Sequence, residues 1–371
     1  MSGVDPGAVM TLGLFEKRIA GDDCLMELAR QRFLEAGLGA EMHADTPEQL
    51  EWMMNFRPWE GAPVMEHLPR EFNLLEGQSQ KQIVEFARRF AGRVAGFVLH
   101  DHAAAAARPD DYIAAARKLD GQLKGIGRCP MLFVEYAVGL EPADFARFFA
   151  AIPDLDQISA CIDIGHVGVS AARLAYARSH GGEDIHTLKW QPARLPQVIT
   201  DVEAAVAAGA AAVFDLVEAI SLVKKPVHFH LHDGHPLSTV SPFGVSDHLS
   251  FLAEIPLGFE HRGRRTAAPM FGPAGLARLV GRAVELISPP NLSFTLEIHP
   301  TGERLPLGAA APLFGHWSDK TNAEQMNHWL ALLSRNHLLL REAIRAAPAL
   351  EARHTVAGPD SQPHLICHDS L

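Results

Sequence analysis

The chain has 371 residues, a hydrophobic fraction of 47% and a formal net charge of −11. This length allows two ordinary domains or one large α/β barrel, and the hydrophobic fraction is sufficient for a core. The acidic balance, with no basic run longer than residues 262–265, argues against broad binding to nucleic acid or to anionic membranes.

Short apolar runs, most of them followed by an amphipathic helical pattern, recur eight times along the chain. The runs that we interpret as strands are Val9–Phe15, Ala40–Ala44, Ala62–Leu68, Val94–His100, Met131–Ala137, Ser159–Ile164, Val227–His232 and Leu292–His299. The helices that we expect are near Cys24–Leu38, from Thr46 onward, and near Gln80–Phe90, Asp110–Leu123, Glu141–Ile152, Ala274–Ile287 and Asn322–Ala346.

Two connections are unusually long. The one after the sixth strand predicts a short helix, a polar excursion and a long Ala-rich helix, and the one after the seventh strand is rich in Gly and Pro. No GxGxxG and no GxxxxGK[ST] motif follows a strand. We therefore predict a single-domain (β/α)8 TIM barrel over residues 8–346, followed by a C-terminal tail, 347–371.

Nothing in the sequence indicates export. The four cysteines form no CxxC pair, and residues 1–10 lack the basic start and long apolar core of a signal peptide. The Ala-rich run 202–222 carries acidic side chains, which is typical of a soluble helix rather than of a membrane span. We expect a cytoplasmic protein without membrane association.

The stretch Pro226–His235 has the wrong composition for an ordinary core strand. Three apolar residues alternate with His228, His230 and His232, so one face of the strand carries three imidazoles. Burying polar groups without partners costs about 1–3 kcal/mol each. These histidines therefore need a metal, a carboxylate network or water.

The ends of the other strands carry similar residue types. Alternation along each strand predicts that the inward-facing set, or residues just beyond it, is His43, His67, His100, His102, Glu135, Asp163, His166, His230, His232, Asp233, Glu297 and His299. In such barrels the carboxyl ends of the strands form the active site. Converging carboxylates repel one another, and a divalent cation such as Mn²⁺, Zn²⁺, Co²⁺ or Mg²⁺ removes that difficulty.

Structural interpretations stay open for some of these residues. His228 lies deepest in its strand and is read as a hydrogen-bonded core histidine, and His43 and His102 as residues behind the ligands or facing solvent. Glu135 alone is compatible with a structural ion pair, and Asp163-Ile-Gly-His166 with a turn closed by the aspartate. Their joint occurrence on successive strands favours a metal site.

The motifs Glu135, Asp163-x-Gly-His166, His230-Leu-His-Asp233 and Glu297 resemble the xylose-isomerase-like TIM barrel superfamily. That group includes keto-sugar epimerases, hydroxypyruvate isomerase, inosose dehydratase and endonuclease IV. The resemblance implies one divalent metal bound by Glu135, Asp163, His230 and Glu297. It also implies that both glutamates move the substrate proton and that His166 contacts a substrate oxygen.

The endonuclease IV branch adds histidines on strands three and four, matched here by His67 and His100 as ligands of a second metal. That branch also has an Asp-x-His after strand seven. The candidates here are Asp247-His248 and Asp233-Gly-His235, so the spacing departs from the pattern.

We expect a metal-dependent isomerase or epimerase of a small keto-sugar or related polyhydroxylated carbonyl compound. Glu135 and Glu297 are the expected base and acid, with His166 and His232 orienting oxygens. The alternatives are a lyase or dehydratase with the same metal site, an endonuclease IV-like phosphodiesterase, and a non-catalytic barrel with a structural metal. We expect the partner to be a carbohydrate-like small molecule and expect no binding of nucleic acid. We also expect the chain to form a homo-oligomer.

Two further features have two readings each. Arg262, Arg264 and Arg265 either bind a substrate phosphate or carboxylate or form a solvated loop patch. The insertion around Trp190 is either an oligomer contact or barrel packing. The histidines of the tail are read as part of a flexible polar segment: His354, His364 and His368.

Overall fold

Eight parallel strands close into a barrel in the described part of the computed structural model, which covers residues 8–12, 23–35, 37–55, 63–238, 248–298 and 323–347. The barrel strands are β1 (Ala8–Leu12), β2 (Gly39–Met42), β3 (Val64–His67), β4 (Gly96–His100), β5 (Met131–Glu135), β6 (Ile158–Asp163), β7 (Val227–Leu231) and β10 (Leu292–Leu296). Their order around the ring is β1-β10-β7-β6-β5-β4-β3-β2, and β1 also pairs with β2. This confirms the predicted (β/α)8 barrel.

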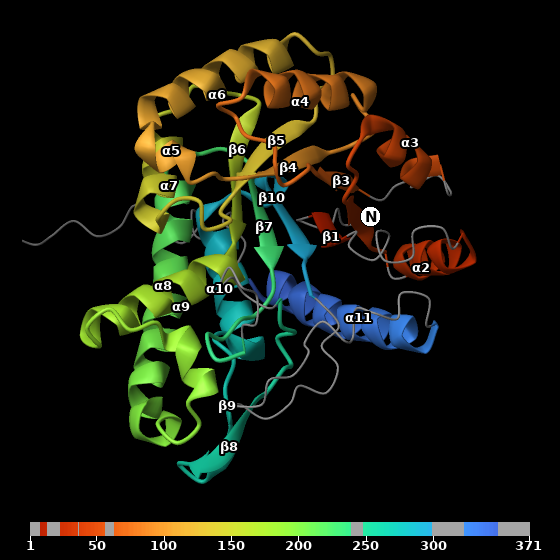
Figure 1. Cartoon of the computed structure of the whole chain (residues 1–371). Coiled ribbons are helices and arrows are strands. Elements are labelled where there is room, and N and C mark those ends of the chain that lie inside the picture. The colour runs from red at the N-terminus through yellow and green to blue at the C-terminus, as the bar shows by residue number, and fades with distance from the viewer. Residues whose placement is uncertain are drawn as a thin grey trace, which may run out of the picture.

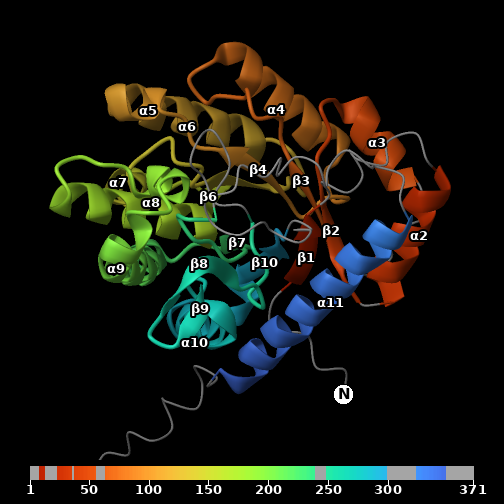
Figure 2. The ribbon, with the colours of Figure 1, turned by 60° about the horizontal axis from the view of Figure 1, so that its bottom comes forward.

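Helices surround the ring of strands (Figures 1 and 2). They are α2 (Asp23–Glu35), α3 (Pro47–Asn55), α4 (Gly77–Arg89), α5 (Ala104–Ala107), α6 (Pro109–Lys124), α7 (Pro142–Ala150), α8 (Ile164–Ser179), α9 (Leu195–Ser221), α10 (Gly272–Leu286) and α11 (Ala323–Ala346). Two 3₁₀ turns are η1 (Ile185–Trp190) and η2 (Pro289–Asn291). Residues 348–371, which hold almost all of the predicted tail, and His299 lie outside the described residues.

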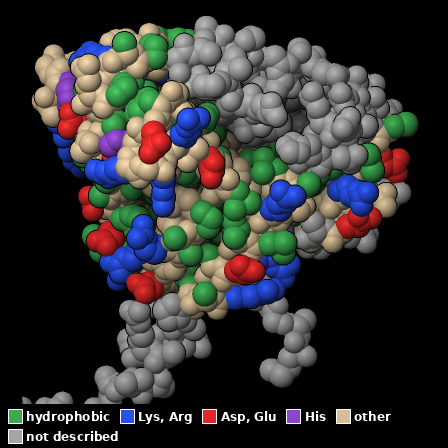
Figure 3. All heavy atoms as spheres, turned by 90° about the horizontal axis from the view of Figure 1, so that it is seen from below, with side chains coloured by type: hydrophobic (Ala, Val, Ile, Leu, Met, Phe, Trp, Pro, Cys, Tyr) green, Lys and Arg blue, Asp and Glu red, His purple; other side chains and the backbone are tan. Residues whose placement is uncertain are grey.

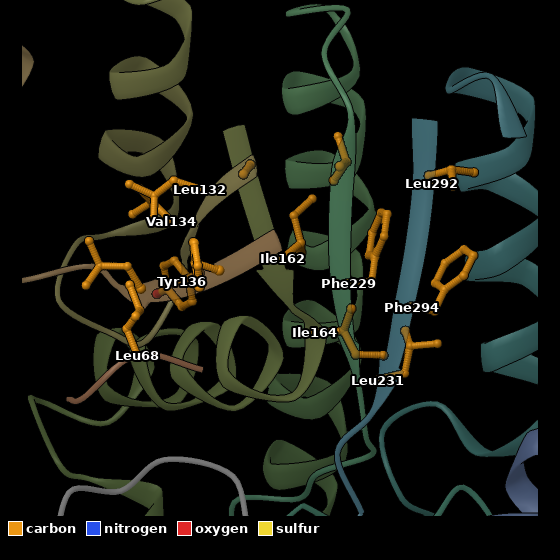
Figure 4. Packing of buried hydrophobic residues seen from close by; sticks show 14 of the residues in the cluster. Leu68, Leu132, Val134, Tyr136, Ile162, Ile164, Phe229, Leu231, Leu292 and Phe294 are labelled. Atoms are coloured by element: carbon orange, nitrogen blue, oxygen red, sulfur yellow. The ribbon is translucent and has the colours of Figure 1, made fainter. Parts of the chain in front are cut away.

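Side-chain alternation along the strands separates a hydrophobic layer, between strands and helices, from the barrel interior. In β7 the outward residues Val227, Phe229 and Leu231 belong to the main hydrophobic cluster that joins strands and helices, as Figure 4 shows for Phe229 and Leu231. Removing a large apolar side chain of this kind from water stabilises the fold by about 1.5–3 kcal/mol. The intervening positions of β7 then face inward, which is where the histidines are.

A small, separate hydrophobic cluster lies inside the barrel. Met65, Val98, Phe133 and Cys161 come from four successive strands, β3 to β6, and are all buried there.

The segment Thr46-Pro-Glu-Gln49 has the residue types of a helix N-cap, and it does cap the start of α3. The Thr46 hydroxyl accepts a hydrogen bond from the Gln49 backbone N–H at 3.2 Å, and the Gln49 side chain accepts one from the Asp45 N–H at 2.7 Å. These reciprocal bonds satisfy N–H groups that a helix start leaves without partners.

The long connections after β6 and β7 pack on each other. Side chains of α8, η1 and α9 form a second hydrophobic cluster with residues of the segment after β7, among them Leu249 and Ile255. The two helices predicted on either side of the polar excursion are present as α8 and α9, but α8 has 16 residues and is not short, and the excursion itself contains η1. Trp190 at the end of η1 is half exposed, and its role in an oligomer stays a prediction.

One prediction for the second connection was incomplete. It contains an antiparallel hairpin of β8 (Ile255–His261) and β9 (Arg264–Ala267), where the sequence predicted only a loop. Arg262 and Gly263 at its tip have φ values of 51° and 74°, as the tight turn of a twisted hairpin requires. Arg262 pairs with Glu203 of α9 at 2.9 Å, so this part of the basic run is an exposed turn.

Helix α9 is long and apolar enough, by length and composition, to cross a membrane. In the barrel its apolar side packs on α7, α8 and α10 instead (Figure 1). Side chains such as Ile199, Val213 and Leu216 are buried against those neighbours. This is the behaviour of a core helix.

The strands β7 and β10 point downward in Figure 1, so Figure 3, seen from below, looks onto the end of the barrel where the strands finish. Among the coloured residues of that face, Lys and Arg side chains are interspersed with Asp and Glu and with hydrophobic ones.

Candidate metal centre

Four strand ends bring three carboxylates and one imidazole to a single point inside the barrel. Glu135 ends β5, Asp163 ends β6, His230 lies in β7 and Glu297 directly follows β10. One ligand atom from each residue lies within 4.8 Å of the others, and all four are buried. These are the four residues that the sequence predicted as metal ligands, and the structure brings them together.

The imidazole of His230 faces two of the carboxylates. Its Nδ1 lies 3.3 Å from Glu135 Oε1 and 3.1 Å from Glu297 Oε2. His230 Nδ1 and Glu297 Oε2 are both buried, and apart from this short contact with each other neither has a hydrogen-bond partner of good geometry among the described residues. A cation placed between them would satisfy both, so the donor set fits a divalent metal.

The charges of this group are strongly perturbed. Burial raises the pKa of Glu297 to about 7, with Asp163 and Glu135 acting in the same direction. Burial also acts to raise the pKa of Glu135, but His230 and His100 hold it well below its ordinary value. The two glutamates therefore differ in proton affinity although they share one site.

A second group shares Glu135 with the first. Glu135 Oε2 lies 2.9 Å from His67 Nε2 and 3.4 Å from His100 Nε2, whereas its Oε1 faces His230. Burial lowers the pKa of His100 to about 3, so this imidazole is neutral and able to act as a ligand. The structure thus brings His67 and His100, the predicted ligands of a second metal, to the other oxygen of the same carboxylate.

A third group lies on the opposite side of Asp163. Asp163 Oδ1 is 2.8 Å from His232 Nε2, and Oδ2 is 3.4 Å from His166 Nε2. The ring of His248 lies 4.1 Å from that of His232 and 5.2 Å from that of His166, centroid to centroid. Ligand atoms of the three histidines lie within 4.8 Å of one another.

Asp163 also organises the chain locally. Its Oδ1 accepts a hydrogen bond from the His166 N–H at 2.7 Å and so caps the start of α8. The turn interpretation of Asp163-Ile-Gly-His166 and the site interpretation therefore both describe this residue. Position 165 of this turn requires glycine for a steric reason, because a Cβ on Gly165 would lie 1.9 Å from the His232 ring.

Of the two candidate pairs after strand seven, the structure brings His248 to the site. His248 Nδ1 lies 3.4 Å from Glu297 Oε1, and the residue has a φ of 51°, which is uncommon for a side chain other than glycine and is found at functional positions. Asp233 instead accepts hydrogen bonds from the N–H groups of Gly234, Phe271 and Gly272 and fixes the start of α10. His235 Nδ1 accepts one from Leu237 N–H.

The remaining histidines behave as structural neighbours of the site. His228 Nδ1 lies 2.7 Å from Ser293 Oγ, which agrees with its reading as a hydrogen-bonded core residue. The ring of His43 stacks on that of His67, with centroids 4.3 Å apart. His102 is exposed, and its Nδ1 accepts a hydrogen bond from Ala104 N–H at the start of α5.

Sequence reasoning missed one carboxylate, Glu41 of β2. It is fully buried, and its carboxylate contacts His228, His230 and Thr295. Burial acts to raise its pKa, but the charge of His230 and hydrogen bonds from His228 and His230 hold it well below its ordinary value. The signal was present in the alternation, since Glu41 lies on the same face of the strand as His43.

Comparisons with known proteins were made by sequence and by structure. No protein-family model and no curated protein sequence matches the chain. Among solved structures, it is similar to a xylose isomerase domain protein from Planctomyces limnophilus, at 10% identity and a TM-score of 0.43 over 91% of this chain and 98% of that one.

Two further similar structures come from pyruvate carboxylase of Rhizobium etli. One, crystallised without acetyl coenzyme A, is 10% identical, with a TM-score of 0.38 over 91% of this chain and 28% of that chain. The other, a carboxyl transferase domain with 3-hydroxypyruvate, is 11% identical, with a TM-score of 0.37 over 94% and 50%. At this level of similarity the assignment of the fold rests on the barrel's own strand order.

Proposed function

We propose that this chain is a divalent-metal-dependent enzyme that moves a proton at a carbon next to a carbonyl in a small polyhydroxylated compound, as isomerases and epimerases do. The observation that carries the proposal is the convergence of Glu135 and Glu297 on His230 Nδ1 from two strands that are not neighbours in the barrel. Carboxylates on two sides of one point are what acid–base exchange at a carbon requires.

The residues divide the work by position. A divalent metal held by Glu135, Asp163, His230 and Glu297 would supply Lewis-acid stabilisation of the negative charge that forms on the substrate oxygens. Glu135 takes the proton from carbon and Glu297 returns one, in keeping with their opposite pKa shifts. His166 and His232 orient substrate oxygens.

The exposed edges of the site indicate how a substrate reaches it. The side chain of His100 is 22% exposed, whereas those of His230 and Asp163 are fully buried. We infer that the substrate enters from the carboxyl end of the barrel, beside His100 and Glu297, and displaces water there.

Solvent exchange tests this proposal. Keto-sugars incubated with the metal-loaded protein in D₂O should gain deuterium at the carbon next to the carbonyl, and Glu135→Gln should slow the exchange by at least about 10²-fold. Glu66→Gln is a matched control, because Glu66 is equally buried on β3 but accepts a hydrogen bond from Ala44 N–H. A product that has lost one molecule of water relative to the substrate would indicate the lyase instead. Undiminished exchange by Glu135→Gln would contradict the role of that residue.

A second candidate, a hydrolase that uses two or three metal ions, is favoured by the groups flanking the central one. Glu135 faces His230 with one oxygen and His67 and His100 with the other, as a carboxylate between two ions does. We therefore expect the number of tightly bound ions per chain to separate the two functions: close to one for the isomerase, two or three for the hydrolase.

A further inference from the structure

Glu41 lies directly behind the ligand His230. Its carboxylate oxygens Oε1 and Oε2 are 3.0 and 3.3 Å from His230 Nε2. The other ring nitrogen of His230, Nδ1, faces Glu135 and Glu297. The imidazole therefore bridges a fully buried carboxylate on one side and the candidate metal position on the other.

Glu41 is itself held in place by Thr295 and His228. The Thr295 hydroxyl donates a hydrogen bond to Oε2 at 2.6 Å, and His228 Nε2 lies 3.2 Å from the same oxygen. His228 is fixed in turn by Ser293, 2.7 Å from its Nδ1. This chain of contacts, all inside the barrel, leaves the carboxylate little freedom to turn away from His230.

An imidazole can bind a metal only through a nitrogen that carries no proton. A carboxylate at one ring nitrogen holds the proton there, leaves the other nitrogen free and makes it a better electron donor. With Glu41 at Nε2, the proton of neutral His230 is on Nε2 and the lone pair is on Nδ1, which points at Glu135 and Glu297.

We propose that Glu41 is a positioning residue of this metal centre, which fixes the orientation and tautomer of His230 so that Nδ1 is the ligand atom. The inference rests on the proposed metal site and goes beyond it by assigning a role to a residue that does not contact the metal. It applies to both candidate functions, since both use His230.

The chain offers a matched control for this role. Glu66, on the neighbouring strand β3, is also a fully buried glutamate, but it faces the helices and accepts a hydrogen bond from Ala44 N–H at 2.6 Å. Replacing either residue by glutamine removes one buried carboxyl group, on β2 or on the adjacent β3. Only the change at position 41 alters the partner of His230.

The first test measures Zn²⁺ affinity of the whole chain by competition with a chelator, together with the melting temperature of each variant. We expect Glu41→Gln to weaken the tightest site by about 10–100-fold and Glu66→Gln to leave it unchanged. Unchanged affinity in Glu41→Gln, or an equal loss in Glu66→Gln, would overturn the role of Glu41 and leave the proposed function standing. Absence of Zn²⁺ binding by the native chain would overturn both.

The second test needs no variant of Glu41. In the native Zn²⁺-loaded protein with ¹⁵N-labelled histidine, the ring signals of His230, assigned with the help of His230→Asn, should show a proton on Nε2 and none on Nδ1. A proton on Nδ1, or Zn²⁺ bound through Nε2, would overturn the proposal even if Glu41→Gln fails to fold.

Discussion

His230 is the residue at which the charges of the site meet. Burial acts to lower its pKa, but Cys161 and the three carboxylates around it raise the pKa well above its ordinary value. In the metal-free site the surrounding carboxylates therefore favour the protonated imidazole. A cation that binds at Nδ1 has to displace this proton.

The consequence is a pH-dependent affinity with a definite sign. Below the pKa of His230 in the metal-free protein, proton and metal compete, so Zn²⁺ affinity should fall about tenfold for each pH unit of acidification. Calorimetry of Zn²⁺ binding in two buffers of different ionisation enthalpy should show release of about one proton per ion at pH 7. A heat that does not depend on the buffer would mean that His230 is already neutral.

At the scale of elements, the start of α8 packs closely against His232, the residue that follows β7. The Asp163-Ile-Gly-His166 turn places Gly165 against the ring of His232, and a Cβ there would lie 1.9 Å from the ring. Because both sides of this contact are buried, the ring has to move if the glycine is replaced.

We therefore expect Gly165→Ala to lower the free energy of unfolding by about 1–3 kcal/mol, as overpacking does, and to disturb the His232–Asp163 contact. Gly121 in α6 is a suitable control, since nothing lies within 4 Å of a Cβ there. Gly121→Ala should raise stability by about 0.5–1 kcal/mol, because alanine is the better helix former. Denaturant unfolding of both variants measures this, and a stable Gly165→Ala protein would show that the turn adjusts freely.

The elements that the sequence predicted are those with a strong local pattern. Alternation identified β7 and the other barrel strands, although most of the strands end one to three residues before the predicted limits. The four alanines of α5 are too short a run to give a helical period. The β8–β9 hairpin was missed although Ile255, Leu257 and Phe259 alternate with less buried residues, because Pro256 and Gly258 within β8 are typical of loops.

The contrast between residues with a local sequence pattern and residues without one also explains which site residues were predicted. Alternation placed Glu135, Asp163, His230 and Glu297 among the inward residues at or near strand ends, and the resemblance to the xylose-isomerase-like superfamily implied that these four are the metal ligands. The alternation that places His43 inward also places Glu41 inward, but its contacts with His228 and His230, 187 and 189 residues away, could not be read from any local pattern. His248 follows a long connection whose path the sequence does not determine.

At the scale of the whole molecule, charge bears on the choice between the two candidate functions. The net charge is −11, and among the coloured residues of Figure 3 basic side chains are interspersed with acidic and hydrophobic ones, which does not favour binding of a nucleic-acid backbone. We expect no meaningful incision of abasic duplex DNA by the metal-loaded protein. Salt-sensitive incision that is lost in His67→Ala and His100→Ala would favour the phosphodiesterase.

The measurement that tests the central claim most directly is the metal content of the purified protein. Mass spectrometric metal analysis should find close to one tightly bound divalent ion per chain. Glu297→Gln and His230→Ala should lose most of it, because removing one ligand weakens the whole set. Full occupancy in both variants would contradict a metal centre at the meeting point of β5, β6, β7 and β10.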